Sequence, residues 1–316
     1  GFVVAHSDPI IAILGPTASG KSEVAQKVAL KLKGEVVSAD SMQIYRYMNI
    51  GTAKLSPAER IVPHHLIDIL DPGEPFSAQL FQQLSRKAFE DIRNRNNVAI
   101  LCGGTGLYVQ AALEDMRFPK GEQIHNPVRE KYELLAQEQG NQAVWNVLYE
   151  LDPSSANLIH ANNVRRVIRA LEMYAQGISY AEQVKNIRTI PEVVPSIRFG
   201  LKRDPLLLAQ RINNRVDSMI ERGLVDEVSQ LLSNGFRSAL TAPQAIGYKE
   251  IVSYLDGKCS LEEAINQIKT ATRRYAKRQR TWLRRDSRLI MLDADTLTIG
   301  QIVDRIVDSF PATSTL

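Results

Sequence analysis

The feature that most constrains this chain is the segment GPTASGKS at residues 15–22, which lies between a short apolar run and an amphipathic segment. The run before it, IIAIL at 10–14, has the length and β-branched content of a buried strand. The residues after it repeat apolar side chains at helical spacing. In a strand–loop–helix context, G-x-x-x-x-G-K-[ST] is typical of a phosphate-binding loop, whose N–H groups converge on an anion at a helix N-terminus. The sequence therefore predicts a phosphate site, although the loop alone does not distinguish a nucleotide from another diphosphate.

Further apolar runs extend this pattern along the chain. Residues 35–40 and 97–104 are expected to form a second and a third strand, and residues 196–202 and 288–294 two later ones. Strands that alternate with helix-like segments are typical of a parallel sheet. We therefore predict an α/β fold with a P-loop NTPase-like parallel sheet and flanking helices.

One stretch interrupts the alternation, because its apolar periods are all helical. We expect residues 118–196 to form an inserted all-helical subdomain, and residues 1–117 and 197–316 to form the catalytic core. Within the second part of the core, long amphipathic helices are expected at 205–232 and 261–285.

Composition excludes several classes of protein. The 316 residues are 44% hydrophobic and 23% charged, with a net charge of +4, as expected of a globular protein. Cys102 and Cys259 lie far apart without metal-ligand spacing, so we expect neither a disulfide framework nor a zinc site, and a reducing compartment. His64 and His65 lack a third ligand at suitable spacing. No signal peptide or membrane span is expected, which predicts a cytoplasmic protein.

The position of the acidic residue near the loop is unusual. A P-loop NTPase should carry a carboxylate at the end of a neighbouring strand to position Mg²⁺, but the third strand ends in Cys102, followed by two glycines and Thr105. Asp40, at the end of the second strand, is the candidate acid. From its position it is equally a general base, a group that orders Mg²⁺-bound water, or the cap of the next turn.

A basic run near the C-terminus indicates nucleic-acid binding. Residues 273–288 hold eight Arg and Lys against the single acid Asp286, a local net charge of +7, and include Tyr275 and Trp282. Such a run is typical of a surface that binds phosphates. The alternative is a solvated helix face in which Trp282 belongs to the core.

Several segments together resemble the tRNA dimethylallyltransferases, also called tRNA isopentenyltransferases. They span nearly the whole chain, and they are GPTASGKS (15–22), SADSMQIY (38–45), GTAK (51–54), PHHLID (63–68), GGTGLY (103–108), RALE (169–172), AIGYKEI (245–251) and TRRYAKRQRTWLR (272–284). The resemblance implies transfer of the prenyl group of dimethylallyl diphosphate to the exocyclic amine of the adenosine immediately 3′ of the tRNA anticodon.

The resemblance also assigns roles to catalytic residues. Asp40 is expected to be the general base, Thr17 to hydrogen-bond the bridging oxygen of the leaving group, and Lys21 and Arg215 to contact the diphosphate. Spacing alone makes Arg215 a solvent-facing helix residue. Ser22 is expected to hold Mg²⁺. The expected diphosphate-binding residues are Gly15, Pro16, Thr17, Ala18, Ser19, Gly20, Lys21 and Ser22.

The partner implied by the resemblance is the tRNA anticodon stem-loop, bound by a monomer without a membrane. The helical insertion and the basic run are both expected to contact it. The predicted tRNA-binding residues are Asp40, Ser41, Met42, Gln43, Thr105, Arg165, Arg166, Arg169, Gly247, Tyr248, Lys249, Arg274, Lys277, Arg278 and Gln279.

Three other functions remain as alternatives. A small-molecule kinase or nucleotidase would use the loop for ATP and Asp40 for the metal, but would leave the basic run unexplained. A noncatalytic RNA-binding protein would need neither the loop nor the acid. A prenyltransferase for free adenine nucleotides would need neither the insertion nor the basic run.

Overall fold

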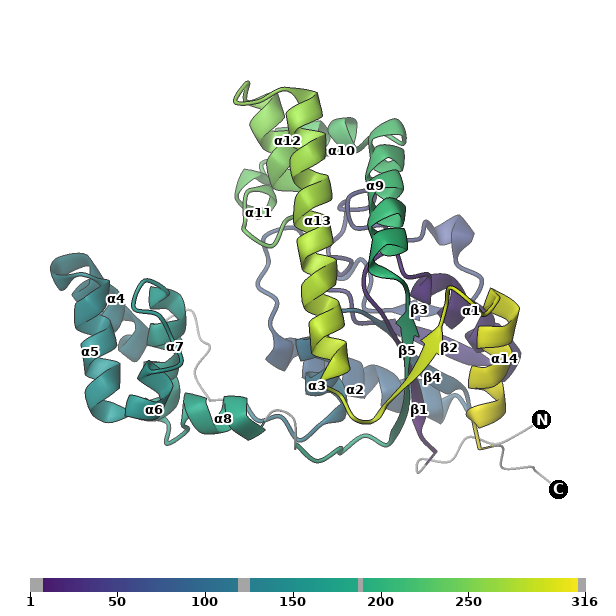
Figure 1. The fold of residues 1–316 in the computed structure, drawn as a ribbon, viewed down its shortest axis with the longest axis horizontal. Helices are drawn as coiled ribbons and strands as arrows, with labels where there is room; N and C mark the ends of the chain where they lie inside the picture. Colours follow the sequence, from purple (N-terminus) through teal and green to yellow (C-terminus); the bar gives the residue numbers. More distant parts are fainter. Residues whose placement is uncertain (1–7, 119–125, 187–189, 312–316) are drawn as a thin grey trace. The chain divides into compact units, whose positions relative to one another are not determined.

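A six-stranded parallel sheet organises the larger part of the molecule (Figure 1). The computed structural model describes residues 8–118, 126–186 and 190–311. The strand order is β3-β2-β4-β1-β5-β6, and every pairing between neighbours is parallel. This confirms the predicted α/β class. The strands are β1 (Ile10–Leu14), β2 (Gly34–Ser38), β3 (His64–His65), β4 (Val98–Gly103), β5 (Ser196–Lys202) and β6 (Leu289–Asp293).

Side chains of β1 alternate between the two faces of the sheet, and both faces are buried. Ile11 and Ile13 pack under α1 (Lys21–Leu32) and α14 (Ile299–Ser309). Ile10, Ala12 and Leu14 pack on the opposite face, against α2 (Ala78–Asn94) and α3 (Gly106–Leu113). Because both faces are covered, the strand is apolar throughout rather than alternating, as is typical of parallel sheets.

The chain separates into two compact units at Glu114–Asp115 and Pro191–Glu192. The predicted insertion ended later, at 196. Residues 192–195 instead belong with the sheet, because the carbonyl of Pro195 accepts a hydrogen bond from Ile10 N–H and Glu192 forms a β-bridge with Glu114.

In the smaller unit, the described residues contain only helices and connecting turns, as expected. These are α4 (Pro127–Gln139), α5 (Asn141–Leu151), α6 (Pro153–Ala156), α7 (Val164–Ala175) and α8 (Tyr180–Asn186). Val144 and Leu148 of α5 meet Val167 and Leu171 of α7 in its core.

Five helices between β5 and β6 form a layer beyond the carboxyl ends of the strands: α9 (Pro205–Glu221), α10 (Leu224–Ser233), α11 (Arg237–Leu240), α12 (Tyr248–Leu255) and α13 (Leu261–Arg284). The prediction of one helix at 205–232 is wrong, because this stretch forms α9 and α10. Gly223 takes φ 108°, a left-handed conformation that ends one helix and starts the next. The helix predicted at 261–285 is confirmed as α13. No helix among the described residues combines the length and the apolar character needed to cross a membrane.

Candidate active site

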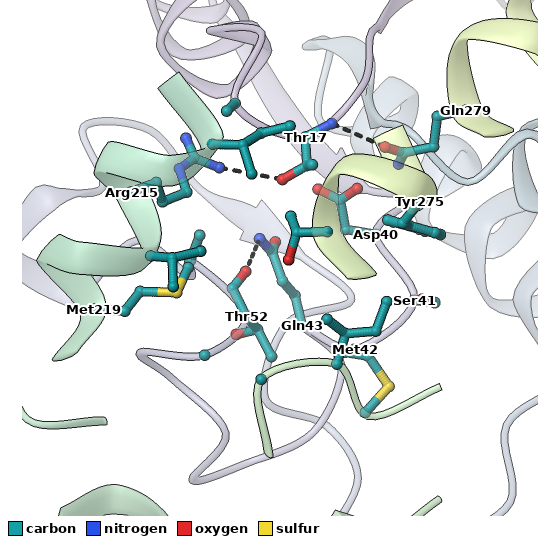
Figure 2. A pocket seen from close by; sticks show the side chains of 18 of the residues that line it. Thr17, Asp40, Ser41, Met42, Gln43, Thr52, Arg215, Met219, Tyr275 and Gln279 are labelled. Atoms are coloured by element: carbon teal, nitrogen blue, oxygen red, sulfur yellow. Dashed lines mark hydrogen bonds between the residues drawn. The ribbon is translucent and has the colours of Figure 1, made fainter. Parts of the chain in front are cut away.

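A cavity of about 490 Å³ opens at the carboxyl ends of β1 and β2, where ligands bind in open α/β sheets (Figure 2). The segment Thr17–Glu23 forms one end of its lining, and residues 40–43 and 51–53 contribute a second part. Helices α9 and α13 and the turn before α12 supply the remainder. Segments far apart in the chain therefore meet around one space.

The phosphate loop has the strained, donor-rich geometry that anion binding requires. Ala18 takes φ 64° and Gly20 φ 94°, both left-handed. Lys21 is buried, and Ser19 Oγ, also buried, has no hydrogen-bond partner among the described residues. A Cβ on Gly15 would lie 2.5 Å from Ser19 Oγ, so a larger residue here would displace the Ser19 hydroxyl. Gly15 and Pro16 form the base of the loop and do not line the cavity, whereas Thr17 to Ser22 do.

Asp40 faces this loop. Its Oδ1 lies 3.9 Å from Lys21 Nζ and accepts a hydrogen bond from Gly104 N–H at 3.1 Å, and its side chain is 21% exposed. The predicted arrangement of a carboxylate opposite the loop is therefore present. Cys102 lies behind the pair, and burial raises the pKa of its thiol to about 12, which keeps it from acting as a thiolate nucleophile.

Arginines surround the loop on its other side. Arg203 Nε donates to the carbonyl of Ser19 at 2.8 Å, and Arg211 Nε donates to that of Ala18 at 2.8 Å. Arg215 Nη1 lies 3.4 Å from Thr17 Oγ1 (Figure 2). Burial, and next the charge of Arg211, lower the pKa of Arg215, because both disfavour its charged form. Arg215 thus points into the site rather than to solvent.

Sequence reasoning missed Arg203 and Arg211. Arg203 follows the predicted strand at 196–202, and Arg211 stands four residues before Arg215 on the same helix. That i, i+4 spacing was a usable signal, because residues so spaced share a helix face. Arg211 lines the cavity together with Lys21 and Arg215, whereas Arg203 does not line it and bonds the loop carbonyl of Ser19.

Gln43 lies across the cavity from Arg215, and its amide orientation is fixed. Its Nε2 donates to the Thr52 carbonyl at 3.1 Å (Figure 2), and its Oε1 accepts from Ser38 Oγ at 3.2 Å. One N–H and one oxygen lone pair of the amide remain for a ligand. Ser41 and Met42 line the cavity beside it, as expected for the acceptor side.

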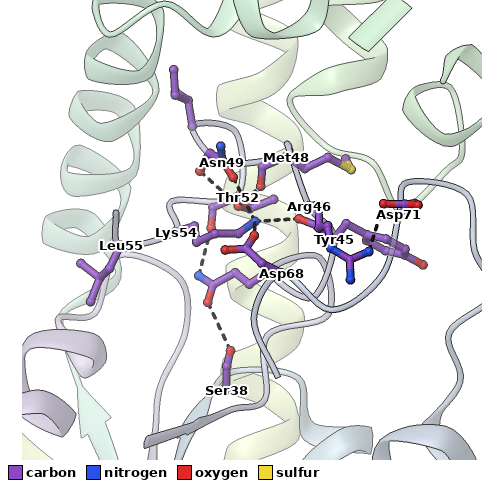
Figure 3. Close-up of polar contacts among 12 residues, drawn as sticks. Ser38, Tyr45, Arg46, Met48, Asn49, Thr52, Lys54, Leu55, Asp68 and Asp71 are labelled. Atoms are coloured by element: carbon purple, nitrogen blue, oxygen red, sulfur yellow. Dashed lines mark hydrogen bonds and ion pairs between the residues drawn. The ribbon is translucent and has the colours of Figure 1, made fainter. Parts of the chain in front are cut away.

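A buried lysine organises the loop that carries these residues (Figure 3). Lys54, whose side chain is 2% exposed, donates to the Tyr45 carbonyl at 2.6 Å, to Asn49 Oδ1 at 3.1 Å and to Asp68 Oδ1 at 2.5 Å. Burial lowers the pKa of Lys54, and the bond to Asp68 opposes that shift. Arg60 also contacts Asp68, at 3.3 Å. This network gives the GTAK and PHHLID segments a structural role that the sequence did not reveal.

A carboxylate holds the same loop from the helical layer. Glu227 on α10 accepts backbone N–H bonds from Asn49, Ile50 and Gly51 at 2.9–3.3 Å. It also accepts the Tyr248 hydroxyl at 2.8 Å. Glu227 was not identified from the sequence, because acids on amphipathic helices are common.

Three predicted RNA contacts have other partners in the structure. Tyr248 is 1% exposed, and its ring packs so closely on Gly51 that a Cβ there would lie 2.5 Å away, so it is a core residue that forms part of the cavity wall. Gln279 Oε1 accepts Thr17 N–H at 2.9 Å and thus supports the phosphate loop. Lys249 Nζ donates to the Pro243 carbonyl and does not line the main cavity, although the neighbouring Gly247 does.

Thr105 contacts the site through a tyrosine. Its hydroxyl lies 3.4 Å from that of Tyr275, whose side chain lines the cavity, whereas Thr105 itself does not. Burial raises the pKa of Tyr275, which keeps its hydroxyl protonated and able to donate.

The basic run forms the exposed face of the C-terminal half of α13. A second hollow, of about 380 Å³, is lined by Arg274, Lys277, Arg278, Thr281, Trp282 and Arg285. Trp282 also packs on Gly106, where a Cβ would lie 1.8 Å from its ring, so this tryptophan is at least partly a core residue. Asp286, the one acid of the run, bonds the buried Arg198 at 2.7 Å, which leaves the outward face cationic.

On α7 of the smaller unit, the three predicted arginines differ. Arg165 and Arg166 are exposed, whereas Arg169 Nη1 lies 3.2 Å from the buried Glu172. Arg165 and Arg166 therefore remain candidates for RNA contact, and Arg169 has a structural ion pair.

The side chains that could hold a metal ion are few. Within the described ranges, no group of three or more His, Cys, Asp and Glu side chains is placed to hold an ion. His64 Nδ1 instead contacts the Val62 carbonyl, and His65 Nε2 contacts Glu35. Ser22 and Asp40 both line the cavity beside the loop, and oxygen ligands of this kind suit Mg²⁺, which commonly takes few protein ligands and completes its shell with phosphate and water.

Comparisons with known proteins agree with this geometry. The family described as IPP transferase matches residues 43–286, and the one described as isopentenyl transferase matches residues 9–62. A tRNA dimethylallyltransferase of Carboxydothermus hydrogenoformans is 47% identical over 306 residues, which cover 95% of this chain and 97% of that protein. One of Bacillus cytotoxicus is 48% identical over 279 residues, or 88% of this chain and 87% of that protein.

Solved structures give the same result. The full-length tRNA isopentenylpyrophosphate transferase of Bacillus halodurans aligns with a TM-score of 0.69 at 40% identity, over 95% of this chain and 96% of that one. A eukaryotic dimethylallyltransferase, captured in crystallographic snapshots acting on tRNA, aligns with a TM-score of 0.79 at 30% identity, over 98% of this chain and 81% of that one. The extent of these matches shows that the chain belongs to the IPP transferase family, whose curated relatives are tRNA dimethylallyltransferases.

Proposed function

We propose that this protein transfers the dimethylallyl group of dimethylallyl diphosphate to the exocyclic amine of the adenosine immediately 3′ of a tRNA anticodon. The observation that carries the proposal is Asp40 facing the phosphate loop across a single cavity. One side of that space suits a leaving diphosphate, and the other presents a base. Relatives of nearly the same length carry the corresponding name.

The loop side stabilises the leaving group. As the bond between the prenyl carbon and oxygen breaks, negative charge grows on the diphosphate, and preorganised cations and N–H donors lower the energy of that state. Thr17, Lys21 and Arg215 line that side of the cavity. In this proposal Lys21 and Arg215 neutralise the developing charge, and Thr17 donates a hydrogen bond to the bridging oxygen. Mg²⁺, held by Ser22, would neutralise further diphosphate charge.

The acceptor side activates the amine. The lone pair of an aromatic amine is delocalised into the ring, so a base that takes the amine proton assists formation of the new C–N bond. Asp40 is the carboxylate placed to do so. The adenine must leave the anticodon stack, at a cost of a few kcal/mol, and the free N–H and lone pair of Gln43 would hold its edge.

A polymeric acceptor is supported by the charge outside the cavity. A cationic face on α13 would serve no purpose for a free nucleotide, but matches the phosphates of a stem-loop. Arg165 and Arg166 would add a contact from the smaller unit. The proposal includes action as a monomer in the cytoplasm, and both cysteines are free, as is usual in a reducing compartment.

The test uses labelled dimethylallyl diphosphate and bulk unmodified tRNA. We expect label in the RNA, and expect Asp40→Asn to lower kcat by about 10²–10⁴-fold, as for loss of a general base. Asparagine keeps an oxygen for Gly104 N–H, so the variant should fold, and its Kd for tRNA should change less than about threefold. Asp91→Asn is the control. This carboxylate is half-exposed on α2, and the variant should have the kcat of the wild type.

Three results would refute the proposal: no label in RNA, ATP hydrolysis without prenyl transfer, or an active Asp40→Asn variant. Transfer to free AMP at a rate equal to that with tRNA would assign the enzyme to nucleotides instead.

A further inference from the structure

Donor and acceptor residues occupy opposite sides of the cavity. Arg215 and Met219 lie together on the α9 side, while Asp40, Ser41 and Tyr275 lie opposite (Figure 2). The acceptor must reach Asp40, so it occupies that second side. The apolar part of the donor is therefore left with the α9 side.

Helix α9 presents a graded face to this space. Its cavity-lining residues are Arg211, Ile212, Arg215, Val216 and Met219, which share one helical face. Arg211 and Arg215 contact the phosphate loop, and Met219 stands four residues beyond Arg215, about 6 Å farther along the axis at a 1.5 Å rise per residue. The face thus changes from cationic at the loop to apolar within roughly one turn.

Packed residues lie behind the apolar end. Val216 and, from α13, Ile268 are each 2% exposed and belong to the same buried cluster. Met219 packs against this cluster while only partly buried itself, so its flexible side chain is the group of this face that meets a ligand. Beyond Arg215, Met219 is therefore the first partly buried apolar side chain of α9 that lines the cavity.

We propose that Met219 sets the length of the prenyl chain by ending the donor subsite, so that a five-carbon allylic diphosphate is accepted and a ten-carbon one is excluded. This inference rests on the proposed function. The diphosphate is the same in all allylic donors, so the phosphate loop cannot discriminate among them. Selection must occur where their hydrocarbon tails differ, and a closed apolar end excludes the larger tail by steric overlap.

The experiment compares dimethylallyl and geranyl diphosphate as donors to tRNA. Met219→Ala should raise the geranyl-to-dimethylallyl ratio of kcat/KM about tenfold or more, the scale on which pocket size discriminates between substrates. Met219→Leu conserves the bulk and is the first control. Ile220→Ala shortens the neighbouring α9 residue, which packs against the same cluster but does not line the cavity, and is the second. Both controls should keep the wild-type ratio.

Binding of the two thiolodiphosphate analogues without RNA provides a second readout, in which Met219→Ala should gain affinity for the geranyl analogue selectively. Met219→Phe, which fills the space, should raise KM for dimethylallyl diphosphate and leave KM for tRNA unchanged.

An unchanged donor ratio in Met219→Ala would overturn the inference, as would a change in KM for tRNA alone with Met219→Phe. Efficient geranyl transfer by the wild type would also overturn it. Failure of the wild type to transfer dimethylallyl at all would instead refute the proposed function.

Discussion

Replacing Glu227 by glutamine tests whether one carboxylate holds the loop of residues 44–55, the acceptor loop, in place. Glu227 Oε1 accepts N–H bonds from Asn49 at 3.1 Å and Ile50 at 2.9 Å. Its Oε2 accepts from Ile50 at 3.1 Å, Gly51 at 3.3 Å and the Tyr248 hydroxyl at 2.8 Å. Burial, and next the charge of Glu227, raise the pKa of Tyr248 well above its ordinary value, so that hydroxyl stays a donor.

The magnitude follows from the donors that glutamine leaves unsatisfied. If the amide nitrogen takes the Oε1 position, Asn49 N–H loses its acceptor, and if it takes the Oε2 position, Gly51 N–H and the Tyr248 hydroxyl lose theirs. Hydrogen bonds to a charged group contribute about 1.5–3 kcal/mol, and the remaining bonds weaken when the charge is lost. We expect Glu227→Gln to cost about 2–4 kcal/mol of stability. Tyr248→Phe removes one bond and should cost about 1–2 kcal/mol.

Urea unfolding followed by circular dichroism measures these losses, and hydrogen exchange of the peptide spanning residues 44–55 locates them. The amides of Asn49, Ile50 and Gly51 should lose protection in Glu227→Gln. KM for tRNA should rise while KM for the prenyl donor stays within about twofold, because the loop continues into Thr52, whose carbonyl orients Gln43.

Glu221→Gln, an exposed acid at the end of α9, should behave as wild type. An unchanged urea midpoint and unchanged exchange in Glu227→Gln would refute the reasoning.

Two further predictions concern the phosphate loop and the edge of the sheet. Gln279→Leu keeps the side-chain volume but removes the acceptor of Thr17 N–H, so KM for the prenyl donor should rise about three- to tenfold without a change in KM for tRNA. Steady-state kinetics with each substrate varied in turn measure both constants. If Gln279 contacted RNA instead, KM for tRNA would rise and KM for the donor would not. Burial raises the pKa of Glu35, but hydrogen bonds from Arg95, Asn97 and His65 outweigh it and lower the pKa from 4.5 to about 2. Glu35→Gln should therefore lower the free energy of unfolding by at most about 3 kcal/mol at pH 7, and this difference from wild type should vanish as pH falls from 4.5 to 2. A difference that stays the same at every pH in urea titrations would contradict this.

Elements with a local signal could be predicted from the amino-acid sequence. The phosphate loop can be recognised because its glycines, lysine and serine lie close together in the sequence. The strand before it can be recognised because it is apolar throughout, as both of its faces are covered. The all-helical character of the smaller unit was likewise readable from periodicity. The two-residue β3 was not, because it is too short to show a period, and Gly223 breaks a helix that apolar spacing alone would continue.

The contacts between distant residues became visible only in the folded molecule. Glu227 and Lys54 look like ordinary surface charges in the sequence, yet they hold the acceptor loop from two sides. Tyr248, expected to contact RNA, lines the cavity as a buried residue whose ring fills the space over Gly51 and whose hydroxyl bonds Glu227. The physical reason is that a side chain's role depends on burial and on partners brought together by the packing of α9, α10 and α13 over the sheet, and no local pattern encodes that proximity.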